Sequence, residues 1–169
     1  RGLPGVAMCV ANTYGPGDFL PTPHGDLVRM AAFGKAPFHV RGVAAECVGV
    51  EDAARALVLA AEEGRVGERY VVSERWMTQQ EVLAIAADEA GVAPPRIGLP
   101  RAVVHLGGAM GEVAARLTGR DDVRLTRNGA LLMHVMTPLD HGKAVRELGW
   151  QPSPTPDAIR AAARFFLDE

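Results

Sequence analysis

The stretch Val6-Ala7-Met8-Cys9-Val10-Ala11-Asn12-Thr13-Tyr14-Gly15-Pro16-Gly17-Asp18 is the strongest indication of the fold. Its first half is short and almost wholly apolar, which predicts a strand at 6–11 that is buried on both faces of a parallel sheet. Its second half is rich in Asn, Gly and Pro, which predicts a loop. Open α/β sheets bind ligands at the carboxyl ends of their strands, so this loop is a candidate ligand site. The alternative is an edge loop that only turns the chain.

The composition of the 169 residues is that of a folded domain with an Ala-, Val- and Leu-rich core, since 48% are hydrophobic and 5% aromatic. The net charge of −2, without a basic patch, argues against nucleic acid or an anionic membrane as the main partner. These 169 residues contain no apolar run of about 18 residues, so we expect a cytoplasmic protein without a signal peptide or a membrane span.

Cysteine and histidine usage gives no indication of a metal or redox site. Cys9 and Cys47 both lie in apolar runs, which predicts two buried free thiols. The five histidines are scattered without the spacing of metal ligands, so no metal site is expected.

The remaining pattern predicts alternating short strands and helices. Thr78 and Glu81 have the spacing of a capping box, and Thr155 is expected to cap the last helix. A Pro-rich stretch at 93–100 is the best candidate for a linker. We expect strands at 37–40, 46–50 and 70–72, and helices at 26–33, 51–63, 78–90, 100–118, 123–135, 141–148 and from 155 onward.

Five motifs together resemble one family. Residues 12–17, Asn-Thr-Tyr-Gly-Pro-Gly, are similar to the Asn-Val-Tyr-Gly-Pro-Gly segment of extended short-chain dehydrogenases/reductases, the NAD-dependent epimerase/dehydratase family. Four further motifs follow in the family's order, at 21–25, 47–54, 67–72 and 140–152. The resemblance covers nearly the whole chain and points to the sugar-epimerase-like and dihydroflavonol-reductase-like branch.

The resemblance implies an α/β fold: the C-terminal part of a Rossmann-like parallel sheet plus a mainly helical substrate-binding lobe. Residues 1–92 would provide the last strands and helices of the sheet with the substrate loop, and 93–169 the helical lobe. The two parts could also form one compact unit.

Two hallmarks of the family are not found in this chain: the Gly-rich dinucleotide fingerprint and the catalytic Tyr-x-x-x-Lys pair. Tyr14 is followed four residues later by Asp18, and Tyr70 by Glu74. The chain therefore resembles the C-terminal half of such an enzyme, with an upstream Rossmann half as its expected partner. We assign no catalytic residue to it.

The resemblance nevertheless implies binding residues. Asn12 matches the family Asn whose amide contacts the substrate, although it could also only stabilise its loop. Val10 and Ala11 match positions whose backbone passes the nicotinamide of NAD or NADP. Tyr14, Thr22 and His24 are candidates to line a substrate pocket, with an exposed loop as the alternative for His24.

We therefore expect the substrate-binding portion of an NAD(P)-dependent epimerase/dehydratase or reductase that acts on a sugar or a similar alcohol or ketone. Such a portion should be inactive alone, and its open sheet edge should favour a homodimer. The alternative is a non-catalytic small-ligand-binding or assembly module derived from that family. Two departures from the family pattern motivate it: Val10 stands where Pro is frequent, and Gly49 where His is common.

Overall fold

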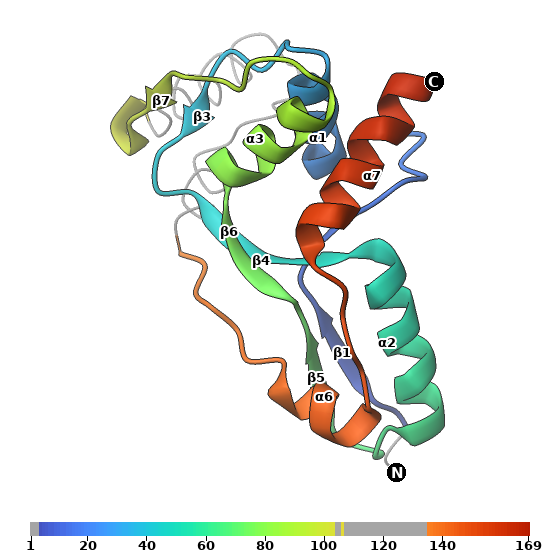
Figure 1. The fold of residues 1–169 in the computed structure, drawn as a ribbon. Helices are drawn as coiled ribbons and strands as arrows, with labels where there is room; N and C mark the ends of the chain where they lie inside the picture. The colour runs from blue at the N-terminus through green and yellow to red at the C-terminus, as the bar shows by residue number, and fades with distance from the viewer. Residues whose placement is uncertain (1–3, 104–105, 107–134) are drawn as a thin grey trace, which may run out of the picture.

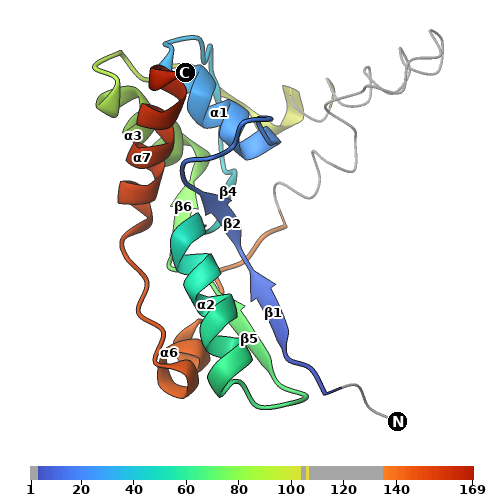
Figure 2. The same cartoon turned by 90° about the vertical axis from the view of Figure 1, so that its right-hand side faces the viewer.

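The computed structural model describes residues 4–103, 106 and 135–169. Figures 1 and 2 show an elongated molecule whose strands and helices gather into two groups, one at each end. One end holds strands β1 and β5 with helices α2 and α6, and the other holds helices α1, α3 and α7. Their bounds are β1 (Ala7–Val10), α1 (Pro23–Ala32), α2 (Val50–Glu63), β5 (Arg69–Val72), α3 (Gln79–Glu89), α6 (Gly142–Leu148) and α7 (Thr155–Asp168).

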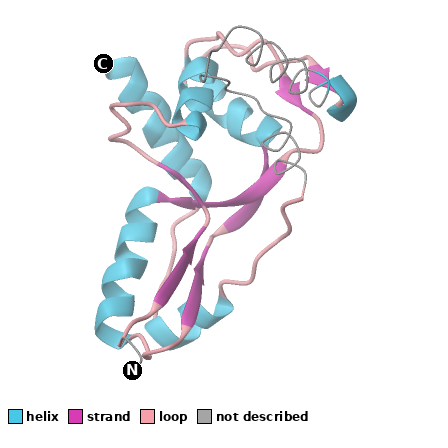
Figure 3. Cartoon of the chain, turned by 180° about the vertical axis from the view of Figure 1, so that it is seen from behind, coloured by secondary structure: helices cyan, strands magenta, loops and turns pink. Residues whose placement is uncertain are grey.

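Short sheets connect these helices, as the view from behind shows (Figure 3). Strands β1 and β5 are paired in parallel. Next along the chain, β2 (Asn12–Tyr14) pairs in parallel with β4 (Ala44–Gly49), which pairs antiparallel with β6 (Arg75–Thr78). A third pair, β3 (His39–Val40) and β7 (Gly98–Leu99), is parallel. The α/β class is thus confirmed. Instead of one parallel sheet the described strands form three short sheets, and the sheet of β2, β4 and β6 is mixed because β6 runs antiparallel to β4.

The opening stretch differs from its prediction in two ways. Strand β1 is not buried on both faces, because Ala7, Cys9 and Val10 are exposed along it. The prediction that Cys9 is a buried thiol is therefore wrong, whereas that for Cys47 is confirmed. The expected loop at 12–14 is strand β2, since pairing with β4 and burial of the Tyr14 side chain favour an extended backbone there.

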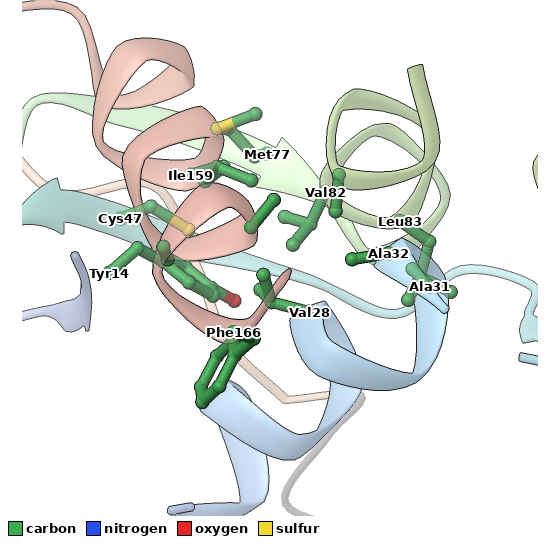
Figure 4. Packing of buried hydrophobic residues seen from close by; sticks show 13 residues of the cluster. Tyr14, Val28, Ala31, Ala32, Cys47, Met77, Val82, Leu83, Ile159 and Phe166 are labelled. Carbon is green, nitrogen blue, oxygen red and sulfur yellow. The ribbon is translucent and has the colours of Figure 1, made fainter. Parts of the chain in front are cut away.

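Two hydrophobic clusters form the core. The first joins α1, α3 and α7 over β4, and Figure 4 shows Tyr14 among its members, near Val28 and Phe166. The second joins α2, α6 and β5 around Trp150, whose indole Nε1 donates a hydrogen bond to the main-chain oxygen of Asp52 at 2.9 Å. In both clusters, residues near the N-terminus and residues after 143 thus pack together, around β4 in the first cluster and β5 in the second.

Side-chain caps set the starts of α3 and α1 but not that of α7. The capping box of α3 is confirmed, because Thr78 and Glu81 each bind the other's backbone amide. Helix α1 begins at Pro23, earlier than expected, because Thr22 is its N-cap. The prediction that Thr155 caps α7 is wrong: the cap is Pro154, and the Thr155 hydroxyl donates to the main-chain oxygen of Cys47 at 3.3 Å.

The helices expected at 100–118 and 123–135 lie almost entirely outside the described residues, although 101–103 are helical. The proposed Pro-rich linker contains β7, which ties it to β3. Among the described helices, none combines the length and hydropathy needed to cross a bilayer.

Candidate functional site

The site is built where β1 ends and β2 begins. Ala11 separates the two strands, and its amide donates to the main-chain oxygen of Val72 at 2.9 Å, at the end of β5. The next residue, Asn12, lies opposite Cys47 in the parallel register of β2 and β4. These contacts fix the main chain at 10–12 at the carboxyl end of β1, where α/β sheets bind ligands.

Asn12 lines two cavities. The junction cavity has a volume of about 240 Å³ and contains three of the residues predicted to bind. It is lined by Val10, Ala11, Asn12, Ala45, Glu46, Val135, Met136, Thr137 and Leu139.

The inner cavity, of about 70 Å³, shares Asn12 and Ala45 with the junction cavity and extends toward α1 and α3. Its lining includes two further predicted residues, Tyr14 and His24. The other described residues around it are Leu27, Val43, Ala44, Cys47, Met77, Gln79 and Val82. The structure therefore brings five of the six predicted binding residues to two adjoining cavities.

Thr22, the sixth, has a structural role. Its hydroxyl accepts a hydrogen bond from the amide of Gly25 at 3.1 Å and donates one to Oδ2 of Asp18 at 2.9 Å. These bonds cap α1 and hold the preceding loop. Thr22 lines a separate cavity of about 220 Å³, together with Tyr14 and Asp18, and not the two cavities at Asn12.

Tyr14 and His24 lie near each other, with ring centroids 6.1 Å apart and planes at 75°. Burial raises the pKa of the Tyr14 phenol, and the nearby Cys47 raises it further. Burial also lowers the pKa of His24, which keeps its imidazole neutral at physiological pH. Both side chains are therefore uncharged where they line the inner cavity, and Tyr14 also packs in the core.

Cys47 is not a candidate nucleophile. Burial, followed by the negative charges of Glu46, Glu74 and Glu81, raises the pKa of its thiol to about 12. The thiol is therefore almost wholly protonated, and a thiolate is needed for nucleophilic attack. Its role is to pack beside Tyr14 in the core.

Glu46 is a site residue that the sequence analysis missed. Its side chain is 7% exposed and lines the junction cavity beside Asn12. Its Oε1 accepts a hydrogen bond from the amide of Leu139 at 3.0 Å, which holds the segment 135–139 against β4. A charged residue is rarely buried, so Glu inside the apolar run 44–49 was a usable signal.

The described residues contain no group of three or more His, Cys, Asp or Glu placed to hold a metal ion. The polar side chains that line the two cavities include the amides of Asn12 and Gln79, the carboxylate of Glu46, the hydroxyl of Thr137, the phenol of Tyr14 and the imidazole of His24. Such a set can bind and orient hydroxyl and carbonyl groups.

Comparisons with known proteins agree with this reading of the fold. No family model matches the chain. A protein named sterol demethylase protein B from Methylococcus capsulatus is 28% identical over an alignment 169 positions long, which covers 99% of this chain and 51% of the relative. The chain thus spans about half the length of this curated relative.

Solved structures show the same relationship. The protein gox2253 is 28% identical with a TM-score of 0.78, over 96% of this chain and 49% of its own. A nucleoside-diphosphate-sugar epimerase from Pseudomonas aeruginosa is 26% identical with a TM-score of 0.72, over 99% and 49%. Two further structures of this fold, at 21% and 16% identity, hold NAD and NADPH. The chain is therefore structurally similar to the NAD-dependent epimerase/dehydratase family, over about half of those proteins.

Proposed function

We propose that this chain forms the substrate-binding part of an NAD(P)-dependent epimerase, dehydratase or reductase that acts on a sugar or a similar alcohol or ketone. The observation that carries the proposal is the position of Asn12. It follows β1 at the carboxyl end of a parallel strand pair and lines both cavities there. The similarity to a nucleoside-diphosphate-sugar epimerase supports the same function.

Each residue of the site has a part in this proposal. The amide of Asn12 can donate to and accept from a substrate hydroxyl or carbonyl without adding charge. Val10, which is 41% exposed, and Ala11 offer an apolar surface beside that amide, which suits a nicotinamide ring. NAD or NADP would supply hydride transfer. Tyr14 and His24 would close the far side of the substrate space.

We further propose that the cofactor fingerprint lies in a Rossmann-like half that pairs with β1. Strand β1 pairs with β5 along one edge, and no described strand pairs with its other edge. Its residues Ala7, Cys9 and Val10 are exposed, and the matched relatives are about twice as long as this chain. An open edge of this kind readily accepts another strand. In the absence of that half, the same edge would pair two copies into a homodimer.

Titration of the ¹⁵N-labelled chain with small ligands tests the substrate role. We would add UDP-glucose, glucose and the two-ring alcohol decahydro-2-naphthol in turn and follow the amide resonances. The proposal expects at least one ligand to shift the amides of 10–12, while the amide of Glu63, at the end of α2, stays unchanged. If no ligand shifts residues 10–12 more than Glu63, the proposed function is wrong.

A further inference from the structure

We propose that the substrate of this site is an uncharged, largely apolar alcohol, and that Glu46 is the residue that selects it against phosphorylated sugars. The inference rests on the proposed function above and defines its substrate class.

The position of Glu46 supports this choice. Its carboxylate lies in the wall of the junction cavity, which also contains Val10, Ala11 and Asn12. The side chain is only 7% exposed, so water screens its charge poorly. A negatively charged diphosphate placed beside Asn12 would be repelled more strongly there than in open water. An uncharged hydroxyl in the same place would not be repelled by the Glu46 carboxylate.

The second carboxylate oxygen of Glu46 can bind the alcohol directly through a hydrogen bond. Oε1 is occupied by the amide of Leu139 at 3.0 Å, and Oε2 has no hydrogen-bond donor among the described residues. Oε2 is not one of the fully buried polar atoms, so it is accessible from the cavity. A carboxylate oxygen is a strong acceptor, and the hydroxyl of a bound alcohol can donate to it. The amide of Asn12 on the same cavity wall can bind the same hydroxyl oxygen.

The rest of the lining favours an apolar body on that alcohol. Val10, Met136 and Leu139 line the junction cavity, and Leu27, Met77 and Val82 line the inner cavity. Burying hydrocarbon against these side chains is favourable, whereas burying the many hydroxyls of a sugar requires a partner for each.

The test compares two ligands on two variants of the full 169-residue chain. Decahydro-2-naphthol is the uncharged probe and UDP-glucose the anionic one, with dissociation constants obtained from the amide shifts of 10–12. Glu46→Gln removes the charge but keeps an oxygen that can accept from Leu139. Glu63→Gln removes an exposed charge at the end of α2 and is the matched control.

We expect the wild type to bind decahydro-2-naphthol more tightly than UDP-glucose. Glu46→Gln should weaken binding of the alcohol about fivefold, because a charged hydrogen bond is replaced by a neutral one. The same change should strengthen binding of UDP-glucose, while Glu63→Gln changes neither. A purely structural role for Glu46 would instead move both affinities in the same direction.

The outcomes separate this inference from the proposed function. If UDP-glucose shifts residues 10–12 and the alcohol does not, the site binds substrate but the selection by Glu46 is wrong. Equal changes for both ligands in Glu46→Gln would also overturn the selection. If neither ligand shifts these residues, the selection by Glu46 is wrong, and if glucose also fails to shift them the substrate-binding role itself fails.

Discussion

Glu46 and Leu139 lie 93 residues apart in the sequence, yet Oε1 of Glu46 accepts a hydrogen bond from the amide of Leu139 at 3.0 Å. This bond attaches the segment 135–139 to β4 and completes the junction cavity around Asn12. It joins the part of the chain that precedes α6 to the strand that positions the site.

Replacing Glu46 by Ala should therefore destabilise the fold. The variant loses a hydrogen bond to a charged group, which contributes about 1.5–3 kcal/mol, and leaves the amide of Leu139 without its acceptor. Glu46→Gln retains an acceptor and should lose clearly less. Urea unfolding followed by circular dichroism measures both. If the urea midpoint of Glu46→Ala equals that of the wild type, the hydrogen bond between Leu139 and Glu46 does not hold the segment 135–139 against β4.

The capping box of α3 gives a local prediction. Thr78→Ala removes the hydroxyl that accepts from the amide of Glu81 at 3.2 Å, and should lower the free energy of unfolding by about 1 kcal/mol. Thr78→Ser keeps the hydroxyl and serves as the control. Equal stability of the Ala and Ser variants in urea would rule out a stabilising role for this cap.

The same capping box should make stability depend on pH. Hydrogen bonds from the Thr78 amide and then from its hydroxyl lower the pKa of Glu81 in the folded protein. Because the folded value is the lower one, the stabilisation is fully present above the unfolded value of about 4.3 and is lost as pH falls through the folded value. We expect wild type to exceed Glu81→Gln in urea midpoint at pH 7, and the difference to shrink toward pH 3. A difference that is constant over this range would contradict the assignment.

The two cysteines should react very differently with iodoacetamide. Cys9 is exposed on β1, whereas the buried Cys47 has a pKa of about 12. At pH 8 roughly one Cys47 thiol in ten thousand would be a thiolate. Intact-mass analysis of the native protein should therefore show one adduct, and peptide mapping should place it on Cys9. A second adduct should appear only in denaturant; rapid double labelling of the native chain would contradict the burial of Cys47.

The features that the sequence predicted are those encoded by neighbouring residues. Thr78 and Glu81 lie three positions apart, so their capping box is visible in the sequence and is confirmed. The helix expected from 155 onward is α7, and helical spacing accounts for its buried face of Ile159, Ala162 and Phe166.

The features that it missed depend on distant partners. Residues 12–14 have the composition of a loop and became β2 because β4 pairs with them. Strand β6 was not predicted because Arg75-Trp76-Met77-Thr78 is extended through its pairing with β4. At the site, family motifs pointed to Asn12 and Tyr14. A Glu inside the apolar run 44–49 was a local signal for Glu46, but its hydrogen bond to Leu139 joins residues too far apart for any local pattern to contain it.

The most direct test of the substrate-binding role is turnover by a hybrid enzyme. In it, this chain replaces the matching half of the Pseudomonas aeruginosa nucleoside-diphosphate-sugar epimerase, whose other half is retained. Net oxidation or reduction is followed by the absorbance of reduced NAD or NADP with a panel of ketones and alcohols. Epimerisation or dehydration, which leaves the cofactor unchanged overall, is followed by NMR of the products formed from UDP-glucose. Both assays are run on the hybrid and on its Asn12→Ala and Glu63→Gln variants. We predict measurable turnover, with kcat/KM reduced about tenfold by Asn12→Ala through loss of a hydrogen bond, and unchanged by Glu63→Gln. A folded hybrid that binds the cofactor but has no turnover, or whose kcat/KM is unaffected by Asn12→Ala, would contradict the account.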